Sequence, residues 1–192
     1  MVDMIYIIRH GQTDLNSKHV LQGQSDHPLN EVGERQAQEA ALLIGNVSFA
    51  KVYSSPLTRA LQTARIAAPG VPVVVDRRLI EMDYGPYEGM DLKNPSPEMA
   101  EFFSDFVHNP APDGMEQLAS VVERCGAFLE DVLEEARATD VLVSTHAIAM
   151  KGLLEYLNPQ SKGGYWSKFI GNCAIYTAKV VEGGFALPVE LR

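Results

Sequence analysis

Two histidines and two arginines follow short apolar runs, at the points where the sequence turns polar. Arg9 and His10 come directly after one such run, His146 follows another, and Arg59 lies a few residues beyond a third. Arginine presents a rigid fork of donors that suits phosphate oxygens. Histidine can act as a nucleophile, a proton carrier or a hydrogen-bond donor. These residue types together predict chemistry on a phosphoryl group, provided that the fold brings them to one place.

Strands and helices alternate along the chain in a pattern that would bring them together. Compact apolar runs predict strands at residues 4–8, 52–53, 71–75 and 141–143. Helical spacing predicts helices at 30–44, 55–68, 96–107, 115–136 and 147–157, of which the first three start at the N-cap residues Asn30, Ser55 and Ser96. Residues 79–89 are expected to form a loop, and residues 174–191 a closing hairpin with a glycine turn.

Strands separated by helices predict βαβ units. The expected fold is therefore a three-layer α/β sandwich, with a mostly parallel sheet, helices on both faces and an antiparallel edge hairpin. The length of 192 residues suits a single domain spanning 1–192, with residues 90–114 as an insertion or lid. Ligands bind such sheets at the carboxyl ends of the strands, which is where Arg9, His10 and His146 are expected.

The composition excludes several other classes of protein. Lys plus Arg is 16 and Asp plus Glu is 25, so the net charge is 16 − 25 = −9, and neither a nucleic-acid partner nor an anionic membrane is expected. No apolar run approaches the roughly 18 residues of a membrane span. Cys125 and Cys173 form neither a disulfide framework nor a metal knuckle. A reducing cytoplasm is therefore the expected location, and no oligomeric state is predicted.

Six blocks of residues occur in a fixed order along the chain. They are Arg9-His10-Gly11-Gln12-Thr13 with Asn16, Gln22-Gly23 and Pro28-Leu29-Asn30; Tyr53-Ser54-Ser55-Pro56-Leu57 with Arg59-Ala60 and Thr63-Ala64; Leu79 with Glu81, Gly85 and Glu88-Gly89; Gly114 with Glu116 and Arg124; Ser144 with His146; and Asn172. The blocks span nearly the whole chain, and together they resemble the motifs of the histidine phosphatase superfamily, the phosphoglycerate mutase-like clan.

The resemblance implies a phosphohistidine mechanism without a cofactor or metal ion, acting on a small phosphorylated substrate. His10 would attack phosphorus, while Arg9, Arg59 and His146 would hold the phosphoryl oxygens. Glu81 would protonate the leaving oxygen, with Glu88 as a fallback, and would then activate water. The residues implied to bind substrate are Gly11, Asn16, Gln22 and Gly23. The assignment of these roles is also reasonable without the resemblance, because phosphoryl transfer needs positioning and charge stabilisation around one nucleophile.

Two electrostatic points follow from this assignment. A cation in the first turn of a helix opposes the helix dipole, so Arg59 is misplaced without an anionic ligand and its replacement should hardly alter thermal stability. The pKa of His10 is subject to opposing effects, because nearby arginines lower it and the net charge of −9 raises it. The sequence leaves the balance open.

Other functions remain as alternatives. The chain has neither a P-loop motif nor a cysteine followed by arginine six residues later, which argues against a P-loop kinase and a cysteine phosphatase. Both histidines with Asp14 and Glu81 could instead ligate a metal, although two converging arginines would repel the cation. Within the resemblance, a phosphoglycerate mutase or a non-catalytic phosphate-binding protein is the alternative to a phosphatase.

The segment from Met82 to Glu123 favours the phosphatase. It contains one lysine, Lys93, against nine acidic side chains, namely Asp83, Glu88, Asp91, Glu98, Glu101, Asp105, Asp113, Glu116 and Glu123. Such a segment should repel the multiply charged substrate of a mutase. Phe102, Phe103 and Phe106 within it are expected to pack in the core. Any of them that faced the cleft would favour a leaving group with apolar surface.

Overall fold

A computed structural model describes residues 4–192. Within that range the strands form a single sheet in the order β3-β2-β4-β1-β5-β6, and β7 also pairs with β5. The strands are β1 (Met4–Arg9), β2 (Phe49–Ser54), β3 (Val73–Val75), β4 (Asp140–Thr145), β5 (Ile175–Val181), β6 (Gly184–Phe185) and β7 (Val189–Leu191). The pairs β1–β4, β2–β4 and β2–β3 are parallel, whereas β5 is antiparallel to β1, β6 and β7.

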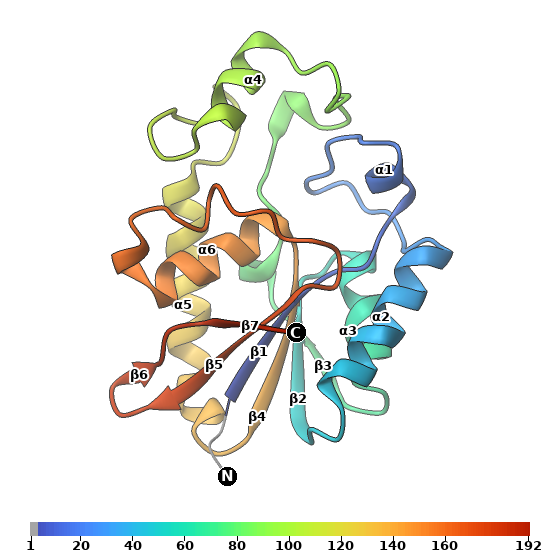
Figure 1. Cartoon of the computed structure of the whole chain (residues 1–192), viewed down its shortest axis with the longest axis vertical. Coiled ribbons are helices and arrows are strands. Elements are labelled where there is room, and N and C mark those ends of the chain that lie inside the picture. Colours follow the sequence, from blue (N-terminus) through green and yellow to red (C-terminus); the bar gives the residue numbers. More distant parts are fainter. Residues whose placement is uncertain (1–3) are drawn as a thin grey trace.

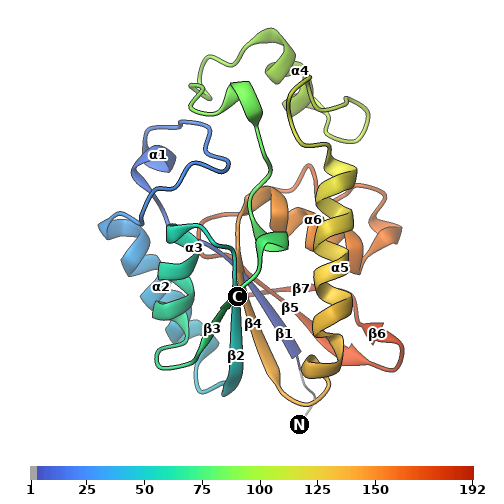
Figure 2. The same ribbon diagram turned by 180° about the vertical axis from the view of Figure 1, so that it is seen from behind.

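Helices cover both faces of the sheet, as Figures 1 and 2 show from opposite sides. The helices are α1 (Asp14–Ser17), α2 (Glu31–Ile44), α3 (Thr58–Ala67), α4 (Pro97–Ser104), α5 (Leu118–Ala136) and α6 (Ala147–Leu157), and the short 3-10 turns are η1 (Arg77–Leu79), η2 (Gly85–Tyr87) and η3 (Pro159–Ser161). The pair α2 and α3 lies on one face, and α5 with α6 on the other. The three-layer α/β prediction is confirmed.

Strand β1 lies in the middle of this arrangement, and its side chains alternate between the two faces. Ile5 and Ile7 belong to the core beneath α5 and α6, while Tyr6 and Ile8 belong to the core beneath α2 and α3. Burial on both faces explains why the strand reads as an unbroken apolar run. Because β1 and β4 pair in parallel, their carboxyl ends meet at one edge of the sheet.

Three predicted helix boundaries are wrong. The helix after β2 starts at Thr58 with Leu57 as its N-cap, and not at Ser55, whose hydroxyl contacts His146 instead. Helix α4 ends at Ser104, three residues before the predicted end, because Asp105 leaves the helix and accepts the backbone N–H groups of the next turn. Helix α5 begins at Leu118.

The loop after β1 packs directly on α2. The Asn30 side chain caps α2 by accepting from the N–H of Gly33 at 2.9 Å, and its own backbone N–H donates to the Gln12 carbonyl at 3.0 Å. A Cβ atom on Gly11 would lie 2.4 Å from the Gly33 carbonyl oxygen, and one on Gly33 would lie 2.1 Å from the Gln12 oxygen. Only glycine permits this backbone approach, which holds the loop beyond His10 in place.

Residues 90–114 lie beyond the carboxyl edge of the sheet. Helix α4 stands at the top of Figures 1 and 2, above the ends of β1 and β4. From Met4 to Arg192, no helix is both long and apolar enough to cross a lipid bilayer.

Candidate active site

The four residues that the sequence singles out first are brought together at the carboxyl edge. Arg9 ends β1 beside Thr145 of β4, and the backbone N–H of His10 donates to the Thr145 carbonyl at 2.9 Å. His146, which follows Thr145, is the N-cap residue of α6, and its ring centre lies 5.1 Å from that of His10. Arg59 reaches the same region from the first turn of α3.

His10 presents a neutral imidazole with one defined nucleophilic nitrogen. Its Nδ1 lies 2.6 Å from the Gly11 carbonyl oxygen. A carbonyl only accepts, so Nδ1 carries the hydrogen and the lone pair remains on Nε2. Burial, and then the charges of Arg9 and Arg59, hold the pKa of His10 well below its ordinary value of 6.5. The balance that the sequence left open is therefore resolved toward the unprotonated form.

His146 is fully buried and is oriented by Ser55. Its Nε2 lies 2.7 Å from the Ser55 hydroxyl, which in turn accepts the Leu57 N–H at 3.3 Å. Its Nδ1 has no hydrogen-bond partner among the described residues. Burial and then Arg59 lower the pKa of His146 well below 6.5. Ser55 is a residue that sequence reasoning assigned only to a helix cap.

The two depressed histidine pKa values predict a pH-dependent stability. Below about pH 6.5 an unfolded chain binds protons at these residues that the folded chain does not, so the free energy of unfolding falls as the pH falls, by up to about 1.4 kcal/mol per pH unit for each histidine. Denaturant unfolding between pH 5 and 7 should show a shallower fall for the double variant His10→Asn, His146→Asn than for the wild type. His19→Asn, which alters an exposed histidine, is the control. Parallel profiles would contradict the prediction.

Arg9 and Arg59 each keep part of the guanidinium without a protein partner. Arg9 donates from Nη1 to the Ile170 carbonyl at 2.5 Å. Arg59, which is 0% exposed, donates to the carbonyls of Ser25 at 2.9 Å and Gly23 at 2.6 Å. The Nε atoms of both are buried without a hydrogen-bond partner among the described residues. Burial lowers the pKa of Arg59 to about 10, which still leaves it cationic at neutral pH.

The contacts of Arg59 overturn the expectation that its replacement hardly affects stability. Truncation would leave two buried carbonyls without donors, and each unsatisfied group costs about 1–3 kcal/mol. We therefore expect Arg59→Ala to lower the melting temperature by several degrees and to lower kcat/KM about 10²–10³-fold, as the loss of one oxyanion donor does. Arg59→Lys should retain more stability than activity, because lysine keeps the charge and lacks the fork. Unaltered kinetics in both variants would remove Arg59 from the site.

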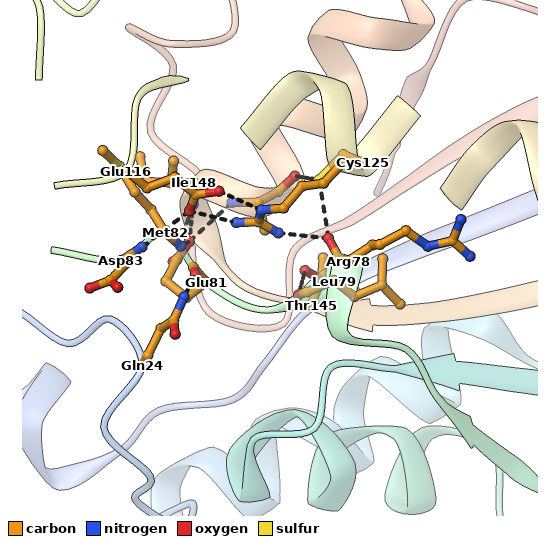
Figure 3. A network of polar contacts seen from close by, with 12 residues as sticks. Gln24, Arg78, Leu79, Glu81, Met82, Asp83, Glu116, Cys125, Thr145 and Ile148 are labelled. Atoms are coloured by element: carbon orange, nitrogen blue, oxygen red, sulfur yellow. Dashed lines mark hydrogen bonds and ion pairs between the residues drawn. The ribbon is translucent and has the colours of Figure 1, made fainter. Parts of the chain in front are cut away.

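Glu81 is anchored at the start of α6. Its Oε1 accepts the backbone N–H groups of Met82 at 2.9 Å, Ile148 at 3.1 Å and Ala149 at 3.0 Å, and Figure 3 shows the carboxylate beside Met82 and Ile148. A helix N-terminus favours a carboxylate. Glu81 is 4% exposed, and its backbone carbonyl also accepts from the Gln24 side chain at 3.1 Å.

The segment that carries Glu81 is fastened on both sides by side chains of other elements. The Thr145 hydroxyl donates to the Leu79 carbonyl at 2.7 Å. Arg124 of α5 donates to the Arg78 carbonyl at 2.6 Å and pairs with Glu116 at 2.7 Å, while Glu116 accepts the Asp83 N–H at 3.2 Å. Figure 3 shows this network around Glu81. Its position is thus fixed by non-local contacts rather than by its own loop.

The predicted substrate-binding residues occupy different positions. Asn16 and Gln22 line the same cavity as His10, and the buried Gln22 Nε2 has no partner among residues 4–192. Gly11 donates its N–H to Thr63 at 3.1 Å and accepts from His10. Gly23 accepts from Arg59. Both glycines contact catalytic candidates and are not among the residues that line the cavity, and their contact with a substrate stays a prediction.

The cavity around His10 has a volume of about 290 Å³. Besides the residues above, its walls include Arg9, Glu81, Tyr84, Phe103 and Phe106. Of the three phenylalanines, Phe102 is a core residue at 1% exposure, as expected, whereas Phe103 and Phe106 face the cavity. Burial, with Glu81 nearby, raises the pKa of Tyr84 well above its ordinary value, so the phenol keeps its proton.

Glu88, the fallback for the acid, has another position. Its carboxylate accepts the backbone N–H groups of Gly23 at 2.8 Å and Gln24 at 3.1 Å, together with the Ser25 hydroxyl at 2.5 Å. It thereby holds the loop whose carbonyls bind Arg59, and it does not line the cavity around His10. Nor do the other acidic residues from 82 to 123, which weakens the argument that they repel a charged substrate.

Metal coordination finds little support in the part of the chain that is described. Residues 4–192 contain no group of three or more His, Cys, Asp or Glu side chains that could hold a metal ion. The alternative that combines both histidines with Asp14 and Glu81 therefore lacks a geometric basis.

Known proteins share these features at the level of sequence. The sequence profile of the Histidine phosphatase superfamily (branch 1) matches residues 5–189. A protein of Yersinia enterocolitica named "Probable phosphoglycerate mutase GpmB" is 33% identical over 159 residues, which are 80% of this chain and 74% of that protein.

Solved structures share them at the level of fold. A histidine-to-alanine mutant of phosphoserine phosphatase from Entamoeba histolytica, in complex with phosphoserine, superposes with a TM-score of 0.82 at 26% identity, over 98% of this chain and 95% of that one. A mycobacterial glucosyl-3-phosphoglycerate phosphatase superposes with a TM-score of 0.78 at 28% identity, over 92% of each chain. The sequence, the fold and the convergence of His10, Arg9, Arg59 and His146 agree, and the chain belongs to the histidine phosphatase superfamily.

Proposed function

We propose that the protein is a phosphohydrolase that cleaves a small phosphomonoester through a phosphohistidine at His10. One observation carries the proposal: a neutral, buried imidazole with its free lone pair on Nε2 lies among two arginines and a second histidine, with an anchored carboxylate on the same cavity wall. Such a site supplies a nucleophile, charge stabilisation and a proton carrier.

In the first step, Nε2 of His10 forms a bond to phosphorus while the bond from phosphorus to the leaving oxygen breaks. Arg9, Arg59 and His146 donate to the three remaining phosphoryl oxygens and stabilise their charge as it shifts in the transition state. Glu81, in its protonated form, gives its proton to the leaving oxygen, so the product alcohol departs neutral. The hydrogen on His10 remains bonded to Nδ1, which continues to donate to the Gly11 carbonyl.

In the second step, Glu81 takes a proton from water as the water oxygen attacks phosphorus. The bond to His10 Nε2 breaks, and inorganic phosphate leaves. Asn16 and Gln22, on the wall of the same cavity, contribute polar contacts to the substrate. Residues 90–114 form a lid, since they bring Phe103 and Phe106 to that cavity. A single domain and a cytoplasmic location remain predictions.

Hydrolysis is proposed rather than mutase activity because two solved structures named as phosphatases superpose on nearly the whole of this chain, although the protein named as a mutase has the higher sequence identity, 33%. The chain spans 95% and 92% of the two solved phosphatases and 74% of the protein named as a mutase. The mutase is the second candidate on the strength of that relative. Both share the first step and differ in whether water or the sugar acid receives the phosphoryl group.

Kinetics with matched substrates test the proposal. Hydrolysis of phenyl phosphate and 4-nitrophenyl phosphate, measured beside the interconversion of 3-phosphoglycerate and 2-phosphoglycerate, separates the two candidates. Hydrolysis that exceeds interconversion supports the phosphatase. Faster interconversion would make the protein a mutase, and no turnover of any ester would favour a non-catalytic member.

Removal of metal ions should leave the activity unchanged. The proposed mechanism assigns all charge stabilisation to protein side chains, so dialysis against a strong chelator should alter kcat/KM by less than about twofold. The metal content should be measured on the same sample. Activity that vanishes with the metal and returns with Mg²⁺ or Zn²⁺ would revive metal-assisted hydrolysis.

A further inference from the structure

A second cavity adjoins the one around His10. Its volume is about 670 Å³, a size typical of sites for sizeable small molecules. We call it the lysine cavity, and its main side chains are Phe103, Phe106, Lys151, Lys162, Trp166 and Lys168. Phe103 and Phe106 line both cavities, and their ring centres are 5.8 Å apart. These two rings are therefore a wall common to the cavity around His10 and the lysine cavity.

Lys151 is the buried cation of this cavity. Its side chain belongs to a residue that is 9% exposed, and its Nζ donates to the Trp166 carbonyl at 2.7 Å. Nζ also lies 5.2 Å from the ring centre of Phe106. No carboxylate of the described residues pairs with it, so an ammonium with three donors has one protein acceptor. A buried charge of this kind is costly unless it is paired.

The position of Lys151 relates it to the catalytic residues. It lies on α6, one turn beyond Ala147 and Ile148, which line the cavity around His10. Burial lowers the pKa of Lys151 to about 8, with Glu81 acting to raise it and Arg9 to lower it. An anionic group next to Nζ would raise the pKa of Lys151 and so oppose the effect of burial.

The surrounding charges also favour an anion. Lys162 and Lys168 line the same cavity, and the carboxylate on its wall, Asp105, contacts His108 at 2.7 Å. Lys168 lies 3.8 Å from Glu190, so it is partly neutralised. Three lysines and one carboxylate line this cavity in a chain of net charge −9, and the buried Glu155 behind its wall is occupied by the Ser161 hydroxyl and the Gly163 N–H. Aromatic side chains, among them Phe169 at 88% exposure, supply apolar surface at the rim.

We propose that the lysine cavity binds the leaving group of the substrate and that Lys151 holds a second anionic group on it. The substrate class is then a small-molecule phosphomonoester whose alcohol reaches from the cavity around His10 into the lysine cavity, has apolar surface and carries a carboxylate or a further phosphate. This inference rests on the proposed function, because it concerns the alcohol released from the phosphoryl group bound at His10. Lys151 acts here as a specificity residue and takes no part in the chemical step.

Paired substrates that differ in one anionic group test this assignment. Phenyl phosphate is compared with 4-carboxyphenyl phosphate, and adenosine 5′-monophosphate with adenosine 3′,5′-bisphosphate, so that the carboxylate and the phosphate are examined separately. In the wild type, kcat/KM should be higher for the acidic member of at least one pair. Lys151→Gln should lower kcat/KM for that member about 10–100-fold, mainly through KM, as the loss of a charged hydrogen bond does. The neutral member should change less than about threefold.

Two further variants sharpen the result. Lys151→Arg should recover part of the preference, because it restores a cation, and Lys93→Gln, an exposed lysine outside both cavities, should leave it intact. The same pairs titrated calorimetrically into His10→Ala, with and without Lys151→Gln, measure binding without turnover. Equal losses for both members of each pair, or a wild type without any preference for the acidic member, would overturn the assignment. If the wild type hydrolyses none of the esters, the proposed function fails, and the calorimetric pairs still decide the binding role of Lys151.

Discussion

Replacing His10 with alanine is expected to lower kcat by about 10⁴-fold or more, which is the scale seen when an enzyme loses its covalent nucleophile. The structure gives the reason. His10 Nε2 is the free nitrogen of a ring whose other nitrogen faces the Gly11 carbonyl at 2.6 Å, and His10 lies on the cavity wall, whereas the His146 ring contacts the Ser55 hydroxyl. Binding of substrate should survive, because both arginines remain.

Rapid-quench experiments with labelled substrate provide the direct measurement. The wild type should yield a phosphoprotein that is labile in acid and stable in alkali, and His10→Ala should yield none. His19→Asn is the matched control, since it removes an exposed imidazole from a nearby segment, and it should retain the adduct. Normal turnover by His10→Ala would exclude the phosphohistidine mechanism.

Glu81→Gln is expected to lower kcat by about 10²–10⁴-fold for esters with a poor leaving group, the range that general acid–base catalysis contributes. An amide has the shape of the carboxyl group and cannot deliver its proton. The loss should shrink as the leaving group becomes a better one, so 4-nitrophenyl phosphate should suffer less than phenyl phosphate or an alkyl phosphate. Plotting the loss against the pKa of the leaving alcohol is therefore the measurement.

The leaving-group dependence separates proton transfer from a structural role. Glu81 accepts three backbone N–H groups, so glutamine also perturbs the start of α6, and that perturbation would affect every ester alike. Glu123→Gln, an exposed glutamate of α5, serves as the control for the substitution itself. A loss that is independent of the leaving group would leave Glu81 as a positioning residue and not as the acid.

Local signals made much of the fold predictable. The apolar run of β1 and the Asn30 cap of α2 lie within a few residues of the features they determine. The convergence of Arg9 and His146 also followed from the sequence, because the carboxyl ends of parallel strands share an edge. Ser55 shows the limit of such local signals. Serine before proline predicts a helix start, whereas in the structure the Ser55 hydroxyl contacts His146, which follows β4 far along the chain.

The rest of the site depends on contacts that no local pattern records. Phe103 and Phe106 pack on Phe102, as three neighbouring phenylalanines suggest, and they also line the cavity around His10, which no local pattern indicates. Lys151 lies in a helix that the sequence predicts as a buried apolar segment. Only the structure shows that its ammonium lies near the Phe106 ring and donates to the Trp166 carbonyl. For the acidic residues between Met82 and Glu123, the charge was evident from the sequence, whereas their position away from the cavity around His10 was not.

The placement of β1 between β4 and β5 has a consequence for synthesis of the chain. Met4 and Asp140, which are joined by a hydrogen bond, are 136 positions apart, and β5 begins only at Ile175. At about 5–20 residues per second, a ribosome needs roughly 7–27 seconds to cover that separation. During this interval β1, which directly precedes His10, lacks both neighbouring strands and presents an apolar edge open to association. We therefore expect this edge to need protection in a nascent chain, and a product that terminates before β4 lacks His146 and with it the paired histidines of the candidate site.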